Sequence, residues 1–233
     1  MHNLRHELKY YIRRDIAETF IRSAGSIFEV DSFAKDKGWY LNRSLYFDTI
    51  RLNEYREYID GEKFRRKYRL RSYDDQFNDC FIEIKYKSNE LVWKSRLKSQ
   101  IDEAILVFSH PEKFRLTPEK EQFLSEIGPK VLRPSVAVSY QRIPLRDKLN
   151  GQVRVTLDFN LRCGGTELFN RQMLPTDHRI IPSNMCILEV KFPNMCPDWL
   201  SDLLKITRMS PAPFSKYAHA VDSYIFRKGV SYG

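Results

Sequence analysis

Residues 64–73 read Phe-Arg-Arg-Lys-Tyr-Arg-Leu-Arg-Ser-Tyr, and this stretch decides the fold. Side chains of a β-strand point alternately to the two faces of its sheet. If the stretch is a strand, one face is wholly cationic and carries Arg65, Lys67, Arg69 and Arg71. Like charges on neighbouring positions of one face are destabilising unless an anion lies against them. The stretch therefore predicts either an ordinary water-facing sheet surface or a site for an anion.

The same alternation of charged and apolar residues recurs along the chain. It marks seven further segments, residues 4–11, 41–48, 81–87, 92–96, 136–142, 153–158 and 187–192. About eight antiparallel strands close into a barrel whose interior holds side chains or one small ligand. Amphipathic patterns predict flanking helices at residues 15–25, 99–110, 117–127, 198–209 and 215–227. We therefore predict a single α+β domain over residues 1–233, an eight-stranded antiparallel β-barrel tunnel with a polar, cationic lumen, flanked by α-helices.

Composition points to an anionic partner in the cytoplasm. The 233 residues include 39 Lys and Arg against 30 Asp and Glu, which gives a net charge of +9 and a pI of about 9.3. That sign suits nucleic acid, an acidic membrane surface or a phosphate-rich small molecule. The sequence has neither an apolar run of the ~20 residues that a membrane span needs nor a signal peptide at its start. Its four cysteines form no C-x-x-C pair, so we expect reduced thiols.

The triplet Glu-x-Lys occurs three times, at residues 7–9, 83–85 and 189–191. Each copy lies in a predicted strand and presents a carboxylate and an ammonium on the same side. Arg and Lys suit phosphate oxygens, whereas carboxylates can hold Mg²⁺ or Mn²⁺ and bridge it to phosphates. The three glutamates are therefore candidate metal ligands, Glu7, Glu83 and Glu189. The alternative is an internal salt bridge to a neighbouring lysine.

Motifs for competing chemistries are missing from the sequence. It contains no G-x-x-x-x-G-K-S/T loop, no G-x-G-x-x-G and no G-x-S-x-G elbow. Aromatic residues do interleave with the basic ones, as at Phe64, Tyr68 and Tyr73, which is typical of surfaces that stack nucleic-acid bases. A non-catalytic binder of polyphosphate or nucleic acid therefore stays open, although an open cationic face would suit such a binder better than a tunnel.

Nine short motifs, taken in order, carry a family resemblance. They are RHELKY at 5–10, SLYFDT at 44–49, DG at 60–61, RRKYRLR at 65–71, EIK at 83–85, YQR at 140–142, VRVTLD at 153–158, LEVK at 188–191 and FSKY at 214–217. In this order they resemble the catalytic domain of the vacuolar transporter chaperone family. That domain is a polyphosphate polymerase of the triphosphate tunnel metalloenzyme superfamily. One departure is Pro213, which stands where yeast members carry a further lysine.

The resemblance implies an ATP:polyphosphate phosphotransferase with a divalent metal, Mn²⁺ or Mg²⁺. Its catalytic cations are expected to be Arg69, Arg71, Arg142 and Arg154. Its other substrate-binding residues are expected to be Lys9, Lys85, Lys94, Tyr140 and Lys216, with Lys191 joining them because it shares a face with Glu189. Glu189 resembles the metal-binding glutamate of the family, and Glu83 and Glu7 are the further metal candidates from the triplets.

Two other activities remain open at this stage. If water replaced the phosphate chain as the nucleophile, the same site would be a metal-dependent hydrolase of triphosphate, polyphosphate or nucleoside triphosphates. The second alternative is a domain that binds polyphosphate without catalysing a reaction. In each case the expected partner is a polyanion, ATP and inorganic polyphosphate for the polymerase, with no specific nucleic acid. We expect a free-standing cytoplasmic domain without a transmembrane segment, which a separate membrane protein could hold at the inner face of the membrane.

Overall fold

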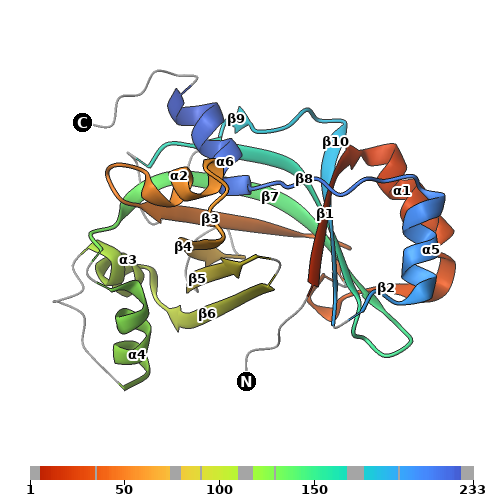
Figure 1. Ribbon diagram of the computed structural model, residues 1–233, viewed down its shortest axis with the longest axis horizontal. Coiled ribbons are helices and arrows are strands. Elements are labelled where there is room, and N and C mark those ends of the chain that lie inside the picture. The colour runs from red at the N-terminus through yellow and green to blue at the C-terminus, as the bar shows by residue number, and fades with distance from the viewer. Residues whose placement is uncertain are drawn as a thin grey trace.

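The computed structural model describes residues 6–34, 36–73, 80–89, 91–109, 118–128, 130–166, 176–193 and 195–226. In these segments a single antiparallel sheet curls around its own axis, and the helices lie on its outside (Figure 1). Residues 4, 5, 110, 117 and 227 of the predicted elements lie outside the described residues.

Eight strands form the main path of the sheet. In spatial order they are β1 (His6–Arg13), β10 (Met185–Phe192), β8 (Arg154–Gly164), β7 (Arg133–Asp147), β3 (Tyr40–Asp48), β4 (Phe64–Ser72), β5 (Cys80–Ser88) and β6 (Leu91–Ser99). Each neighbouring pair is antiparallel, so the eight predicted strands are confirmed. Two short strands off this path, β2 (Phe28–Val30) on β7 and β9 (His178–Arg179) on β8, were not predicted, because two or three residues show no alternation.

The sheet closes into a tunnel through side chains. Among the described residues no backbone pairing joins the two ends of the path, β1 and β6. Across this seam, Lys85 Nζ of β5 lies 3.3 Å from Glu7 Oε1 of β1. The predicted tunnel fold is confirmed, although the sheet is not strictly closed by hydrogen bonds.

The helices cover the outer face of the sheet. They are α1 (Arg14–Ser23), α2 (Asn53–Ile59), α3 (Ile101–Ser109), α4 (Pro118–Ile127), α5 (Asp198–Ile206) and α6 (Lys216–Val221), and residues 222–226 continue α6 as a π-helical turn. Figure 1 shows α1 beside α5 at one end of the molecule and α3 with α4 at the opposite end, beside β6. None of the helices in the described part of the chain has the length and apolar character to cross a membrane.

Five of these helices match the predicted ones, whereas α2 was not predicted. Its amide groups are capped from a distance, since the Asp48 carboxylate accepts hydrogen bonds from Glu54 N at 3.1 Å and Tyr55 N at 3.0 Å. A capping residue normally lies next to the first turn. Because this cap stands at the end of β3, no local pattern marks the start of α2.

The core lies between the outer face of the sheet and the helices. Leu70 and Ile82, for example, are fully buried in one cluster with Phe108 of α3. Leu188 is fully buried with Phe20 of α1 in a second cluster. Burying one such side chain stabilises the fold by ~1.5–3 kcal/mol. The apolar strand faces therefore point outward to the helices, which leaves the charged faces pointing inward.

Candidate functional site

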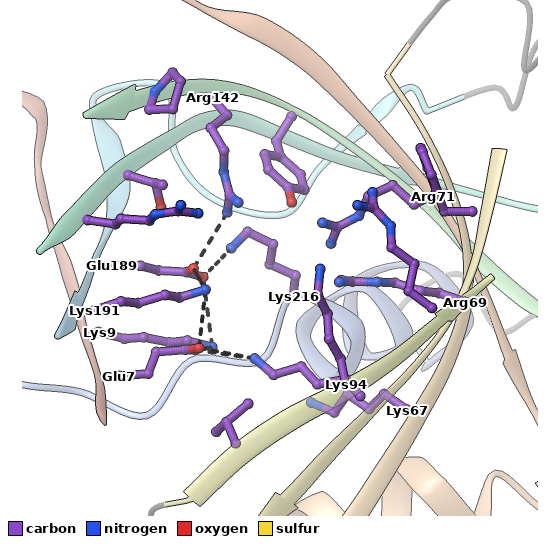
Figure 2. A pocket seen from close by; sticks show the side chains of 18 of the residues that line it. Glu7, Lys9, Lys67, Arg69, Arg71, Lys94, Arg142, Glu189, Lys191 and Lys216 are labelled. Carbon is purple, nitrogen blue, oxygen red and sulfur yellow. Dashed lines mark hydrogen bonds and ion pairs between the residues drawn. The ribbon is translucent and has the colours of Figure 1, made fainter. Parts of the chain in front are cut away.

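The inward faces of the strands enclose a cavity of about 740 Å³. Twelve of the thirteen predicted site residues line it, namely Glu7, Lys9, Arg69, Arg71, Lys85, Lys94, Tyr140, Arg142, Arg154, Glu189, Lys191 and Lys216. Figure 2 shows cationic side chains converging on this space from opposite walls. The thirteenth residue, Glu83, is fully buried in the wall beside Arg69. The structure thus brings the predicted residues together from seven strands and from α6.

The antiparallel register pairs two of the Glu-x-Lys triplets with each other. Glu7 of β1 lies opposite Lys191 of β10, and Lys9 lies opposite Glu189. The Lys191 Nζ to Glu7 Oε2 distance is 3.4 Å, and the Lys9 Nζ to Glu189 Oε1 distance is 3.8 Å. Directly opposed side chains of opposite charge stabilise a strand pair. The recurring triplet is therefore self-complementary in an antiparallel pair, which is a structural reason for its repetition.

Glu189 lies among four cations. The distances from its carboxylate oxygens are 2.9 Å to Lys216 Nζ, 3.5 Å to Arg142 Nη2 and 3.8 Å to each of the ammonium groups of Lys9 and Lys191. Burial alone raises the pKa of this carboxyl, but the four cations, Lys216 first, outweigh it and hold the pKa well below its ordinary value. Glu189 is therefore an ionised carboxylate inside the cavity, and its oxygens are available as ligands for a cation.

Glu7 is the second ionised carboxylate of the cavity wall. Its oxygens lie 3.1 Å from Lys9, 3.3 Å from Lys85 and 3.4 Å from Lys191. Burial raises its pKa, whereas these three lysines, Lys85 first, lower it to well below its ordinary value. Two of the lysines, Lys9 and Lys191, contact both Glu7 and Glu189, so the two carboxylates lie on either side of shared ammonium groups.

The carboxylates fit a divalent metal that the substrate helps to hold. In the described part of the chain no three or more His, Cys, Asp or Glu side chains gather into a metal site. Mg²⁺ is usually bound by one or two carboxylates together with substrate phosphates, without a cage made only of protein. Glu7 and Glu189 match that donor chemistry, and phosphate oxygens in the cavity would complete the coordination.

Glu83 has a different setting from the other two glutamates. Its Oε2 lies 2.7 Å from Arg69 Nη2 and 3.5 Å from Arg71 Nε, and its Oε1 lies 3.2 Å from Arg96 Nε and 3.3 Å from Lys94 Nζ. Burial raises its pKa, but these cations, Arg69 first, lower the pKa far more. The position corresponds to the internal salt-bridge alternative, and a metal-binding role for Glu83 stays a prediction.

Asp158 was not singled out from the sequence as a site residue. It is fully buried and forms a two-point ion pair with Arg142, at 2.5 and 2.6 Å, and a further contact with Lys216 at 2.6 Å. The ring of Tyr140 lies beneath both cations, with centroid distances of 5.3 Å to Arg142 and 5.0 Å to Lys216. Asp158 therefore fixes two phosphate-binding candidates. Its place on the inward face, four residues after Arg154, was the available signal.

Lys67 was also missed as a site residue, although it belongs to the cationic row of β4. It lines the cavity and contacts the Ser215 hydroxyl at 2.5 Å, and no carboxylate in the described part of the chain forms an ion pair with it. Burial, followed by repulsion from Lys9 and other cations, lowers its pKa well below the ordinary lysine value. Burial likewise lowers the pKa of Lys85 to about 7. Both ammonium groups would gain from a bound anion.

A second cavity of about 680 Å³ adjoins the first. The two share six lining residues, Glu7, Lys9, Lys67, Lys85, Val92 and Ser215. Beyond these the second cavity is lined by Tyr58, Arg65, Lys87 and Pro213, among others. The lumen therefore extends through both cavities and continues its cationic lining beyond Lys67.

Fold and site together define an antiparallel β-tunnel with a strongly cationic lumen. The sequence model of the VTC domain matches residues 4–225, so the chain belongs to the VTC domain family and the predicted resemblance is confirmed. No curated protein matches the chain.

One solved structure shares the fold at low sequence identity, and two others are similar to this chain at lower TM-scores. A protein from Bacillus halodurans described as a "putative adenylate cyclase (bh2851)" is 12% identical, with 91% of this chain and 94% of that chain covered and a TM-score of 0.54. The PH1819 protein from Pyrococcus horikoshii OT3 is 13% identical, with 93% and 97% covered and a TM-score of 0.46. The Mimivirus capping enzyme triphosphatase is 12% identical, with 88% of each chain covered and a TM-score of 0.37.

Proposed function

We propose that the chain is a polyphosphate polymerase, which transfers the γ-phosphate of ATP to the end of an inorganic polyphosphate chain inside the tunnel. The observation that carries the proposal is the lumen formed by the two joined cavities, with cations on every wall. A linear polyanion needs neutralising contacts along its length, and a long lumen supplies them at several points. Membership of the VTC domain family supports the same substrate class.

The cations are held in place before any substrate binds. Glu83 orients Arg69 and Arg71, and Asp158 orients Arg142. Arg71 still has donor capacity, because its buried Nε makes no hydrogen bond within the described residues. Phosphoryl transfer depends mainly on positioning and on neutralising charge on the transferring group. A wall of preoriented guanidinium groups supplies both.

The acceptor in this proposal is a phosphate and not water. Glu7, Glu83 and Glu189 have lowered pKa values because cations surround them, so each is a weak proton acceptor. The terminal phosphate of a polyphosphate chain is already an anion and needs no base to activate it. Water does need one, and these three carboxylates do not supply it.

Glu189, with Glu7 beside it, would hold the divalent metal. A bound Mn²⁺ or Mg²⁺ supplies charge neutralisation on the phosphate oxygens. The protein's own cations position the phosphates and neutralise the rest of their charge. Lys9, Lys191 and Lys216 hold the carboxylates in place and bind the polyphosphate chain. Arg154 and Lys94 add cations to the more exposed parts of the cavity lining.

The test is to incubate the purified protein with ATP and Mn²⁺ and to separate the products on a polyphosphate gel. We expect a ladder of long chains that disappears with Arg69→Ala and with Arg154→Ala, whose side chain is exposed and whose loss should leave the fold intact. Arg22→Ala, an exposed arginine of α1, is the matched control and should keep the ladder. Release of orthophosphate alone would identify a hydrolase, and binding of polyphosphate without turnover would identify a binding domain. Either result would refute the polymerase.

A further inference from the structure

A group of aromatic side chains lines one end of the lumen and has no part in the proposed transfer. We call Phe33, Tyr40, Tyr73 and Phe81 the aromatic mouth; all four line the first cavity and none lines the second. The order of residues along β4 and just after it shows where the aromatic mouth lies. Lys67 lines both cavities, whereas Arg69, Arg71 and then Tyr73 line only the first. The aromatic mouth therefore lies at the end of the lumen remote from the second cavity.

The rings contact one another edge to face. The centroid distances are 5.0 Å for Phe33 and Tyr40, 5.4 Å for Phe33 and Tyr73, and 5.5 Å for Tyr40 and Tyr73, with interplanar angles of 68–88°. Phe33 is 62% exposed, so this ring contributes little to the core. A single exposed apolar side chain is normal, but linked aromatic rings at the rim of a cavity are a feature of ligand sites.

Cationic groups lie next to the rings, on the side of the lumen interior. The guanidinium carbon of Arg96 lies 3.6 Å from the centroid of Phe81, and Arg96 Nη2 donates a hydrogen bond to the Tyr73 hydroxyl at 3.1 Å. The guanidinium carbon of Arg71 lies 6.0 Å from the ring centroid of Tyr73. Arg96 and Arg71 both contact Glu83, which connects the aromatic mouth with the cationic wall. Along the lumen the order is thus aromatic rings first and cations next.

That order matches the two ends of a nucleoside triphosphate. We propose that the aromatic mouth is a base-stacking platform, on which the nucleobase of the donor nucleotide lies against Phe33 and Tyr73 while its phosphates reach Arg96 and Arg71. The inference rests on the proposed function, because it assigns the donor nucleotide to this end of the lumen. Stacking on aromatic rings is tolerant of base identity, since every base has a π-face. ATP and GTP should therefore bind with similar affinity.

The test compares two ligands that differ in the base. Calorimetry would measure the affinities for ATP and for inorganic tripolyphosphate, both without metal, in the wild type and in Phe33→Ala. Loss of one stacking ring costs ~1–3 kcal/mol, which is about 5- to 150-fold in affinity. We expect ATP to bind more weakly by a factor in that range and tripolyphosphate to be unchanged within about twofold. Phe33→Trp should keep the ATP affinity, and Phe64→Ala, an exposed phenylalanine that lines neither cavity, is the matched control.

Two results would overturn the platform. An unchanged ATP affinity in Phe33→Ala would show that the ring does not contact the base. An equal loss for ATP and tripolyphosphate would show that Phe33 only shapes the lumen. Both measurements are of binding, so they remain decisive if the protein makes no polymer. Conversely, if the protein makes polyphosphate but Phe33→Ala binds ATP with unchanged affinity, the base-stacking platform is refuted and the polymerase proposal stands.

Discussion

Replacing Glu83 by Gln removes the negative charge around which Arg69, Arg71, Lys94 and Arg96 gather in the tunnel wall. Glu83 is fully buried, and Arg69 and Arg71, which contact its Oε2, are largely buried as well. In Glu83→Gln these guanidinium groups would stay close together without a counter-charge. We expect the empty variant to be strongly destabilised, and we expect an added polyanion to reverse much of that loss.

The magnitude follows from the burial of each partner. Breaking a buried ion pair by removing one member costs ~3–5 kcal/mol, because the remaining charge stays buried and unpaired. Arg69 and Arg71 fall in that class. Lys94 and Arg96 have side chains 48% and 34% exposed, and such pairs contribute only ~0–1 kcal/mol each. We therefore expect a loss of ~3–5 kcal/mol, which lowers the melting temperature of a chain of this size by about 6–20 °C.

The sign of the pH dependence is also defined. Because the pKa of Glu83 is lowered in the folded protein, its contribution to stability is present above the ordinary carboxyl pKa of 4.5 and is lost as the pH falls through the folded-state value. The difference in melting temperature between the wild type and Glu83→Gln should therefore be largest at neutral pH and shrink in acid. Glu18→Gln on the exposed face of α1 is the matched control and should change little.

Thermal unfolding with and without tripolyphosphate is the assay. A ligand that binds only the folded state stabilises it in proportion to its affinity, so tripolyphosphate should raise the melting temperature of Glu83→Gln more than that of the wild type. The reasoning would be refuted if the empty variant unfolded at the wild-type temperature. Wild-type stability combined with loss of metal-dependent turnover would instead identify Glu83 as a metal ligand.

Three further predictions concern other residues of the lumen. Glu189→Gln should abolish turnover that depends on Mn²⁺ while keeping or raising the affinity for tripolyphosphate in the absence of metal, and retained turnover would argue against its metal-binding role. Because burial depresses the pKa of Lys67, the tripolyphosphate affinity of the wild type should fall as the pH rises towards the ordinary lysine value, by up to about tenfold per pH unit for this proton. The tripolyphosphate affinity of Lys67→Arg should fall less steeply with pH. Calorimetry across the pH range is the measurement, and identical profiles for the wild type and Lys67→Arg would show that Lys67 keeps its charge. Ser215 caps α6 by accepting a hydrogen bond from Ala218 N, so Ser215→Ala should cost ~1 kcal/mol in denaturant unfolding, whereas Ser125→Ala on α4 should cost less.

The period-two pattern of charges was sufficient to predict the strands, each with one charged face and one apolar face. Charged side chains alternate with buried ones such as Tyr68 and Leu70 in β4, and a strand with one apolar face must pack that face against other apolar groups. What the pattern could not decide was whether the charged face meets water or a lumen. That depends on the curvature of the sheet and on helices such as α3 packing against its outer face, which are tertiary properties.

The roles of the three Glu-x-Lys triplets could not be distinguished from the sequence for a related reason. The triplets are locally equivalent, but the register places Glu83 opposite Arg69 and Arg96, and Glu189 opposite Lys9 and Thr156. Pairing with two arginines puts Glu83 inside a cationic wall. Pairing with a lysine and a threonine leaves Glu189 at the cavity surface. The environment of each carboxylate is therefore a property of strand pairing and not of its own segment.

The carboxylates also explain how a lumen with so many cations can fold when it is empty. If every inward position were cationic, repulsion between neighbours would oppose closure of the sheet. Glu7 and Glu189 offset that repulsion between β1 and β10, and Glu7 also joins β1 to β5 across the seam. The compensation is incomplete, since burial, together with repulsion from neighbouring cations, still lowers the pKa values of Lys67 and Lys85. A bound polyanion would supply that charge, so the same shortfall that limits the stability of the empty tunnel favours binding of a phosphate chain.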